Sequence, residues 1–144
     1  MYFITYSYNI ICLLARMLFG LAFSERKTAQ LLKNIETKFS GRFSPTTFKK
    51  IKKFQGIQQY IINDSFAKFE NRTTNTKERE NNKLYFVLAS LYDDLMDENI
   101  VSQAVLNEMF LNPAQATPGS FSETVLIDTH LKLLSLVHHK EAYQ

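Results

Sequence analysis

The chain has few of the residues that form tight turns or cross-links. Among its 144 residues are four glycines, three prolines and a single cysteine, Cys12. So few turn-forming residues disfavour a sandwich or barrel, because those folds need many tight connections. One cysteine excludes an intramolecular disulfide and a cysteine-based metal site, and it fits a reducing compartment. We therefore expect a single all-α domain and a cytoplasmic location.

Positive charge is missing from much of the second half. No Lys or Arg lies between Leu84 and Leu131, although seven acidic residues do. Residues 1–83 carry 15 Lys and Arg against 6 Asp and Glu, whereas residues 84–144 carry 2 against 8. These carboxylates therefore lack cationic partners nearby in sequence. Their charge could be balanced by the basic first half packed against them, by a divalent metal or by solvent.

The first 23 residues are largely apolar but lack the pattern of a signal peptide or a membrane span. No basic segment precedes the apolar stretch, Arg16 interrupts it, and Thr5, Ser7 and Asn9 dilute it. We expect residues 3–23 to form a first helix that is buried or lies on a membrane surface without spanning it.

Apolar periodicity predicts an antiparallel bundle of about six helices. The expected ranges are 3–23, 26–39, 45–70, a central buried helix through 83–99 that starts near Thr76, 101–111, and 122 to about 143. Ser40 and Gly41 are expected to end the second helix, and Ser44 followed by Pro45 to begin the third.

The last predicted helix has a clear beginning but no end signal. Ser120 or Ser122 before Glu123 is typical of a helix start. Because the helix then continues to the end of the sequence, we expect residues 1–144 to be the N-terminal half of a larger helical domain.

Acidic residues cluster at the end of the central helix, in the run Asp93-Asp94-Leu95-Met96-Asp97. On a helix the three aspartates share one patch, where they repel one another at the negative end of the helix dipole. Carboxylate oxygens suit Mg²⁺ or Mn²⁺, and Mg²⁺ is often shared with substrate phosphates. The pattern therefore predicts a metal site that binds a diphosphate. A solvated acidic helix end is the alternative, and the spacing disfavours a calcium loop.

The same helix could also line an apolar pocket for a hydrocarbon tail. Tyr85, Phe86, Ala89 and Tyr92 are the candidates nearest to the aspartates. Metal-assisted ionisation of an allylic diphosphate would need both a metal for the leaving group and such a dry pocket. No residue is singled out as a catalytic acid, base or nucleophile.

The segment KLYFVLASLYDDLMDE at 83–98 resembles the first aspartate-rich helix of class I isoprenoid synthases, which include prenyl-diphosphate, squalene/phytoene and terpene synthases. Together with GRFSPTTFKKIKKF at 41–54 and VSQAVL at 101–106, it is similar to bacterial proteins called class 1 isoprenoid biosynthesis enzymes. The resemblance covers about residues 35–140. It implies the type I isoprenoid-synthase fold around a central cavity, with Asp93, Asp94 and Asp97 binding Mg²⁺ and a prenyl diphosphate for transferase or lyase chemistry.

The chain departs from that family in several places. After Asp97 nothing matches the family's second acidic motif, because Glu108, Glu123 and Asp128 are isolated. No arginine follows the first motif, and residues 40–45 only faintly resemble the basic segment that precedes it in chain-elongating members. We expect Arg42 of this segment to contact phosphate, and turnover only when the missing half is present.

Lys49, Lys50, Lys52 and Lys53 form a basic cluster with four interpretations. They could form a solvated helix face, a patch that contacts the phosphates of nucleic acid or anionic lipid, a surface that opposes the acid-rich half across the bundle, or part of a diphosphate site. His130, His138 and His139 are expected at the surface.

A non-catalytic helical domain, with an acidic rim that contacts a basic surface, is the alternative to the isoprenoid function. The expected partners are a prenyl diphosphate and a membrane surface that is not spanned. Nucleic acid is not expected, and homo-oligomerisation is left open.

Overall fold

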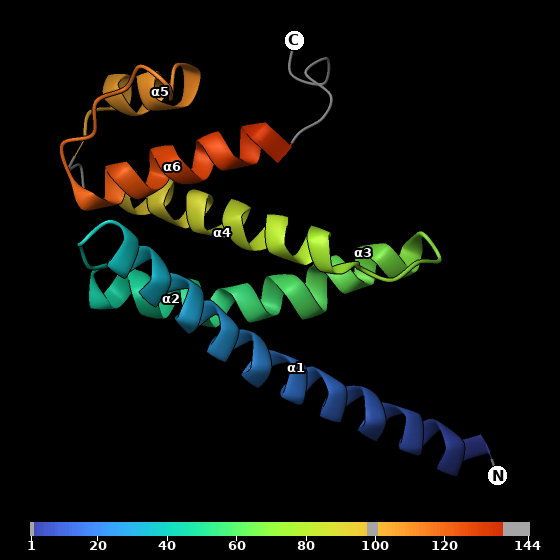
Figure 1. Ribbon diagram of the computed structural model, residues 1–144. Coiled ribbons are helices and arrows are strands. Elements are labelled where there is room, and N and C mark those ends of the chain that lie inside the picture. The colour runs from blue at the N-terminus through green and yellow to red at the C-terminus, as the bar shows by residue number, and fades with distance from the viewer. Residues whose placement is uncertain (1, 98–100, 137–144) are drawn as a thin grey trace.

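The computed structural model describes residues 2–97 and 101–136, and within them every regular element is helical (Figure 1). In chain order these elements are α1 Tyr2–Lys38, α2 Pro45–Ile57, the π-helical segment η1 Gln58–Asn63, α3 Asp64–Phe69, α4 Thr76–Asp97, α5 Gln103–Leu111 and α6 Phe121–Leu136. The all-α prediction is confirmed. Among these residues no helix combines the length and apolar character needed to cross a membrane.

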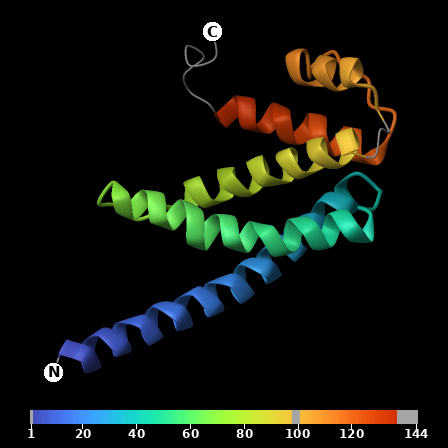
Figure 2. The same ribbon diagram turned by 180° about the vertical axis from the view of Figure 1, so that it is seen from behind.

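The main packing is between antiparallel neighbours in the spatial order α1, α2, α4 and α6. In both views α2 lies between α1 and α4, and α6 runs back along α4 (Figures 1 and 2). The core forms where these helices face one another, because each contributes an apolar stripe at helical spacing. Its fully buried members include Leu32 of α1, Ile51 of α2, Val87 and Leu91 of α4, Leu106 of α5 and Leu126 of α6.

The predicted break between a first and a second helix at residues 24–25 is wrong, because α1 continues through it. The polar run Ser24-Glu25-Arg26-Lys27 contains no glycine or proline, so nothing in it opposes a helix. Ser24 and Thr28 are buried, which places the polar turn against the bundle. A run of polar residues therefore does not indicate a loop here, because Ser24 faces the bundle and Arg26 and Lys27 face solvent on one continuous helix.

The predicted helix over 45–70 is continuous in direction but not in hydrogen bonding. The six residues that directly follow α2, Gln58–Asn63, form η1, and α3 follows η1 without a loop. Gly56 lies just before η1, and a glycine inside a helix weakens the regular hydrogen-bond pattern.

The predicted starts of α2, α4 and α6 agree with the structure to within a residue, whereas α5 begins two residues later than predicted, at Gln103. Ser44 caps α2, where its Oγ accepts from the Thr47 amide at 3.0 Å, and Ser120 accepts from the Glu123 amide at 3.3 Å before α6. At α4 the cap is Asn75 rather than Thr76, because Asn75 accepts from the Glu78 amide at 2.9 Å. Glu78 accepts in turn from the Asn75 amide at 2.8 Å, which completes a capping box. The predicted end of the last helix near Tyr143 lies outside the described residues.

The connection from α1 to α2 depends on close packing as well as on turn geometry. Ser40 adopts a left-handed conformation with φ 51°, the position that glycine usually takes after a helix. Gly41 serves another purpose, because a Cβ there would lie 2.0 Å from the ring of Phe121. That ring in turn packs edge-on against Phe43, with centroids 5.0 Å apart. The connection is thereby fixed against the start of α6.

Candidate functional site

The end of α4 meets the beginning of α2, at the same end of the bundle (Figure 1). Lys50 of α2 extends its Nζ to Asp93 Oδ2 at 2.5 Å and to Asp94 Oδ1 at 2.8 Å. Thr47, one turn earlier, donates its hydroxyl to Asp94 Oδ2 at 2.6 Å. Thr47 is also held by the cap, because its Oγ1 lies 2.8 Å from Ser44 Oγ. Two carboxylates, an ammonium and two hydroxyls therefore share one junction between helices.

This arrangement explains how α4 tolerates acids at its C-terminal end. The α4 dipole disfavours negative charge there, but the N-terminal turn of α2 presents the positive end of its own dipole. Hydrogen bonds to Asp93 and then to Asp94 raise the pKa of Lys50, against the opposing effect of burial. Asp94 is the more enclosed carboxylate, with 22% of its side chain exposed against 58% for Asp93. Asp94 therefore anchors the junction, and Asp93 lies toward solvent.

A third acid of the second half is balanced in the same way. Asp128 of α6 pairs with Lys38 at the end of α1 at 2.8 Å, and with Lys132 one turn further along α6 at 2.6 Å. Burial tends to raise the pKa of Asp128, but its hydrogen bonds with Lys132 and Lys38 outweigh burial and lower it. The sequence left three ways to balance the charge of these acids: the basic first half, a divalent metal or solvent. For Asp93, Asp94 and Asp128, lysines of the basic first half form ion pairs with the carboxylates.

Asp97 is not part of this junction. It lies at the end of α4, its side chain is exposed, and its contacts do not include Lys50 or Thr47. Among residues 2–97 and 101–136, no group of three Asp, Glu, His or Cys side chains is placed to hold a metal ion. Because Mg²⁺ is commonly bound through one or two carboxylates plus phosphate oxygens, a metal at Asp93 and Asp94 would need a phosphate ligand to supply further oxygens.

The basic cluster of α2 divides among different surroundings. Lys50 turns toward α4, whereas Lys52 reaches across to Glu25 of α1 at 3.3 Å. Lys49 and Lys53 are exposed, and Lys53 lies over the ring of Phe54 with its Nζ 5.8 Å from the centroid. An open hollow beside the junction is lined by Pro45, Thr46, Lys49, Lys50, Lys53 and Phe54. Lys50 thus takes part in the acidic junction and also lines the neighbouring basic hollow, to which Pro45 and Phe54 contribute apolar side chains.

The predicted pocket-lining residues do not share one environment. Tyr85 is 62% exposed and Ala89 is also exposed, so both lie on the outer face of α4. Phe86 and Tyr92 are partly buried against the core, and Tyr92 packs edge-on against Phe110 with centroids 4.9 Å apart. Arg42 is exposed in the connection before α2 and takes no part in the contacts of the junction.

His130 is enclosed rather than simply exposed, which corrects the surface prediction. Its ring stacks at a tilt on Phe110, with centroids 4.7 Å apart, and its Nδ1 is buried without a partner among the described residues. Burial lowers the pKa of His130, although a hydrogen bond with the Met109 backbone acts in the opposite direction. His138 and His139 lie outside the described residues.

Thr47 is the part of the junction that the sequence analysis did not single out, and Ser44 entered that analysis only as a helix cap. The available signal was the Ser44-Pro45 helix start, which orients the first turn of α2, together with a hydroxyl one turn before Lys50. Thr47 is buried, which is unusual for a polar residue in an exposed first turn.

No family model matches this sequence, and no curated protein or solved structure is significantly similar to it.

Proposed function

We propose that the Asp93–Asp94–Lys50 junction is the diphosphate-binding half of a class I isoprenoid-synthase-like site. The observation that carries the proposal is Lys50, which is held by both aspartates and also lines the basic hollow beside them. An ammonium between two carboxylates marks a place where a cation is electrostatically favoured. In the proposal, Lys50 moves from the aspartates to a diphosphate when the ligand arrives.

The residues around Lys50 suit a diphosphate with an apolar tail. Lys49 and Lys53 are exposed in the hollow and would pair with phosphate oxygens. Phe54, at the same hollow, offers an exposed aromatic surface to a hydrocarbon chain. Thr47 keeps Asp94 oriented after Lys50 leaves, because its hydroxyl bond to that carboxylate does not depend on the lysine.

Asp93 and Asp94 would hold Mg²⁺ jointly with the diphosphate, and Asp97 is the candidate for a further ligand. A bound metal would stabilise negative charge on a departing diphosphate. The hollow itself is open, whereas ionisation of an allylic diphosphate needs a site from which water is excluded. In this proposal the described residues bind the diphosphate. The ionisation step would take place only in a closed site to which additional helices contribute.

Calorimetry with an unreactive allylic diphosphate analogue, with and without Mg²⁺, tests this proposal. We expect Mg²⁺-dependent binding that falls at least about tenfold in Asp93→Asn/Asp94→Asn, since one charge-assisted contact is worth about 1.5–3 kcal/mol. Lys50→Met should weaken analogue binding while leaving the aspartates free for Mg²⁺. Glu108→Gln, an acid of α5 outside the junction, is the matched control and should bind like the wild type.

A non-catalytic helical domain is the second candidate, and the completeness of the junction favours it. Lys50 and Thr47 already satisfy Asp93 and Asp94, so the group can serve as a clamp between α2 and α4. In that case none of the variants would change analogue binding. Asp93→Asn/Asp94→Asn would still lower the free energy of unfolding by about 1 kcal/mol, in the range measured for partly exposed ion pairs.

A further inference from the structure

The outward face of α1 carries large exposed apolar side chains, although the Lys27 ammonium lies over the ring of Phe23, 4.7 Å from its centroid. Ile11, Leu18, Phe19 and Phe23 are all exposed, Phe19 to 79%. Their spacing of seven, one and four residues places them on one side of the helix. The opposite side, with Ser24, Thr28 and Leu32, is buried against the bundle. Polar residues thus lie inward at this part of α1 and aromatic residues lie outward, the reverse of an ordinary surface helix.

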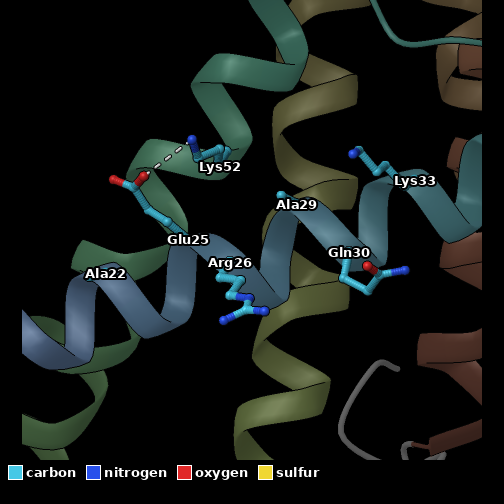
Figure 3. Close-up of a pocket in the computed structure, with 7 residues that line it drawn as sticks. All are labelled: Ala22, Glu25, Arg26, Ala29, Gln30, Lys33 and Lys52. Atoms are coloured by element: carbon cyan, nitrogen blue, oxygen red, sulfur yellow. Dashed lines mark ion pairs between the residues drawn. The ribbon is translucent and has the colours of Figure 1, made fainter.

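The same face becomes basic further along the helix. Arg26 follows Phe19 by seven residues and Lys33 follows Arg26 by seven, so all three lie in line. Arg26, Gln30 and Lys33 line a groove together with Ala22, Ala29 and Lys52 of α2 (Figure 3). Glu25 is the acid of this groove, and its carboxylate is paired with Lys52 at 3.3 Å. Arg26 and Lys33 are exposed, so the groove offers positive charge to an anion.

The N-terminal turns of α1 extend beyond the rest of the bundle. In both views they stand apart from α4 and α6 (Figures 1 and 2). A flat surface could therefore approach the apolar end of α1 without meeting the body of the molecule. The first acidic residue of the sequence is Glu25, so the projecting part carries no negative charge that such a surface would repel.

We propose that this face of α1 binds the surface of a bilayer that contains anionic phospholipids. The apolar end, Leu18, Phe19 and Phe23, would enter the boundary between headgroups and acyl chains, and Arg26 and Lys33 would contact headgroup phosphates. The order of the two parts along one helix face is what selects a membrane over a folded acidic protein. A bilayer presents an anionic headgroup layer next to an apolar one, which matches the basic and apolar parts of this face. The inference does not depend on the diphosphate proposal.

Sedimentation with vesicles of phosphatidylcholine, with and without phosphatidylglycerol, tests the inference. The full chain is expected to bind the anionic vesicles and to bind phosphatidylcholine alone far more weakly. Arg26→Gln/Lys33→Gln should reduce binding to the anionic vesicles roughly 30-fold, since each basic residue near the surface contributes about a factor of five. Phe19→Ser/Phe23→Ser should abolish binding that persists at high salt.

Matched control variants distinguish vesicle binding by this face from nonspecific electrostatic or hydrophobic binding by the rest of the surface. Lys68→Gln/Lys77→Gln removes the same charge from exposed lysines on α3 and α4, and Leu111→Ser removes an exposed apolar residue from α5. Both should bind vesicles like the wild type, and circular dichroism should confirm that every variant is folded. Equal loss in the controls would overturn the inference.

Two further results would also overturn it. Displacement from vesicles by inorganic phosphate at constant ionic strength would make the groove a site for free phosphate. A dimer in analytical ultracentrifugation that Phe19→Ser/Phe23→Ser converts to a monomer, without vesicle binding by either protein, would assign the face to contact between copies of this chain.

Discussion

At the scale of single residues, Ser40 and Gly41 play different roles in the connection after α1. Ser40 holds the left-handed conformation, and Gly41 leaves space for the ring of Phe121. Ser40→Gly should raise the free energy of unfolding by about 0.5–1 kcal/mol, because glycine adopts this conformation without steric cost. Gly41→Ala should lower it by about 1–3 kcal/mol, because the ring must move to admit the methyl group.

Urea unfolding of the two variants measures both effects. Opposite signs are the result that the structure predicts. A stabilised Gly41→Ala would mean that the Phe121 ring does not pack on this connection.

His130 is the residue whose titration should affect stability near neutral pH. Burial lowers its pKa below the value of about 6.5 in an unfolded chain. As pH falls below 6.5, the unfolded state takes up a proton more readily than the folded state, so stability decreases. Asp128, whose pKa is lowered, loses its stabilising charge only at more acidic pH, near and below the ordinary carboxylate range.

His130→Gln should therefore have a flatter dependence of unfolding free energy on pH between 7 and about 5. Thermal unfolding over that range, in wild type and variant, makes the comparison, and His138 and His139 cancel because both proteins contain them. Identical slopes would show that His130 titrates alike in the folded and unfolded chain.

At the scale of elements, α2 contains an unusual buried amide near its C-terminal end. Gln55 is fully buried, and neither its Nε2 nor its Oε1 has a hydrogen-bond partner among the described residues. A buried polar group without a partner costs about 1–3 kcal/mol. Gln55→Met keeps the shape of the side chain and removes that cost, so it should stabilise the protein by about 1–2 kcal/mol.

The matched control is Gln103→Met, an exposed glutamine at the start of α5, which should change stability by less than about 0.5 kcal/mol. Chemical denaturation of both variants gives the comparison. A destabilised Gln55→Met would indicate that an ordered water or a ligand meets the amide.

Element boundaries followed from the sequence where local chemistry decides them. Ser44 and Ser120 cap helices because a hydroxyl beside the first free amides is a local interaction. The continuity of α1 did not follow, because the burial of Ser24 and Thr28 depends on the packing of the bundle against that side of the helix. The π-helical turns of η1 were not predicted either, because the single glycine before them, Gly56, gives only a weak local signal.

At the scale of the whole molecule, charge segregation along the sequence becomes charge pairing in the fold. The basic half supplies Lys50 to Asp93 and Asp94, and Lys38 to Asp128. The sequence predicted that the two halves could neutralise each other, and the aspartate run indicated where. The sequence alone could not show which of the clustered lysines pairs with the aspartates, because the pairing of Lys50 depends on how α2 is rotated and placed against α4.

The same dependence on packing limits what the sequence says about the site. Asp93 and Asp94 share the Lys50 ammonium, and Asp97 lies outside that contact, so the predicted Mg²⁺ site at the three aspartates stays a prediction. Tyr85 and Ala89 lie on the outer face of α4, so a pocket that includes them would need further helices to cover it. The resemblance to class I isoprenoid synthases stays a prediction that binding measurements must test.

The most direct measurement is paramagnetic line broadening by Mn²⁺ in the ¹H–¹⁵N NMR spectrum, with and without inorganic diphosphate. If the junction is a shared metal and diphosphate site, Mn²⁺ with diphosphate should broaden the amides of Thr47, Asp93 and Asp94 first. That broadening should require diphosphate and disappear in Asp93→Asn/Asp94→Asn. Broadening that is spread over exposed carboxylates such as Glu70 and Glu108, or that is unchanged in the variant, would contradict the account and leave the junction as a clamp between α2 and α4.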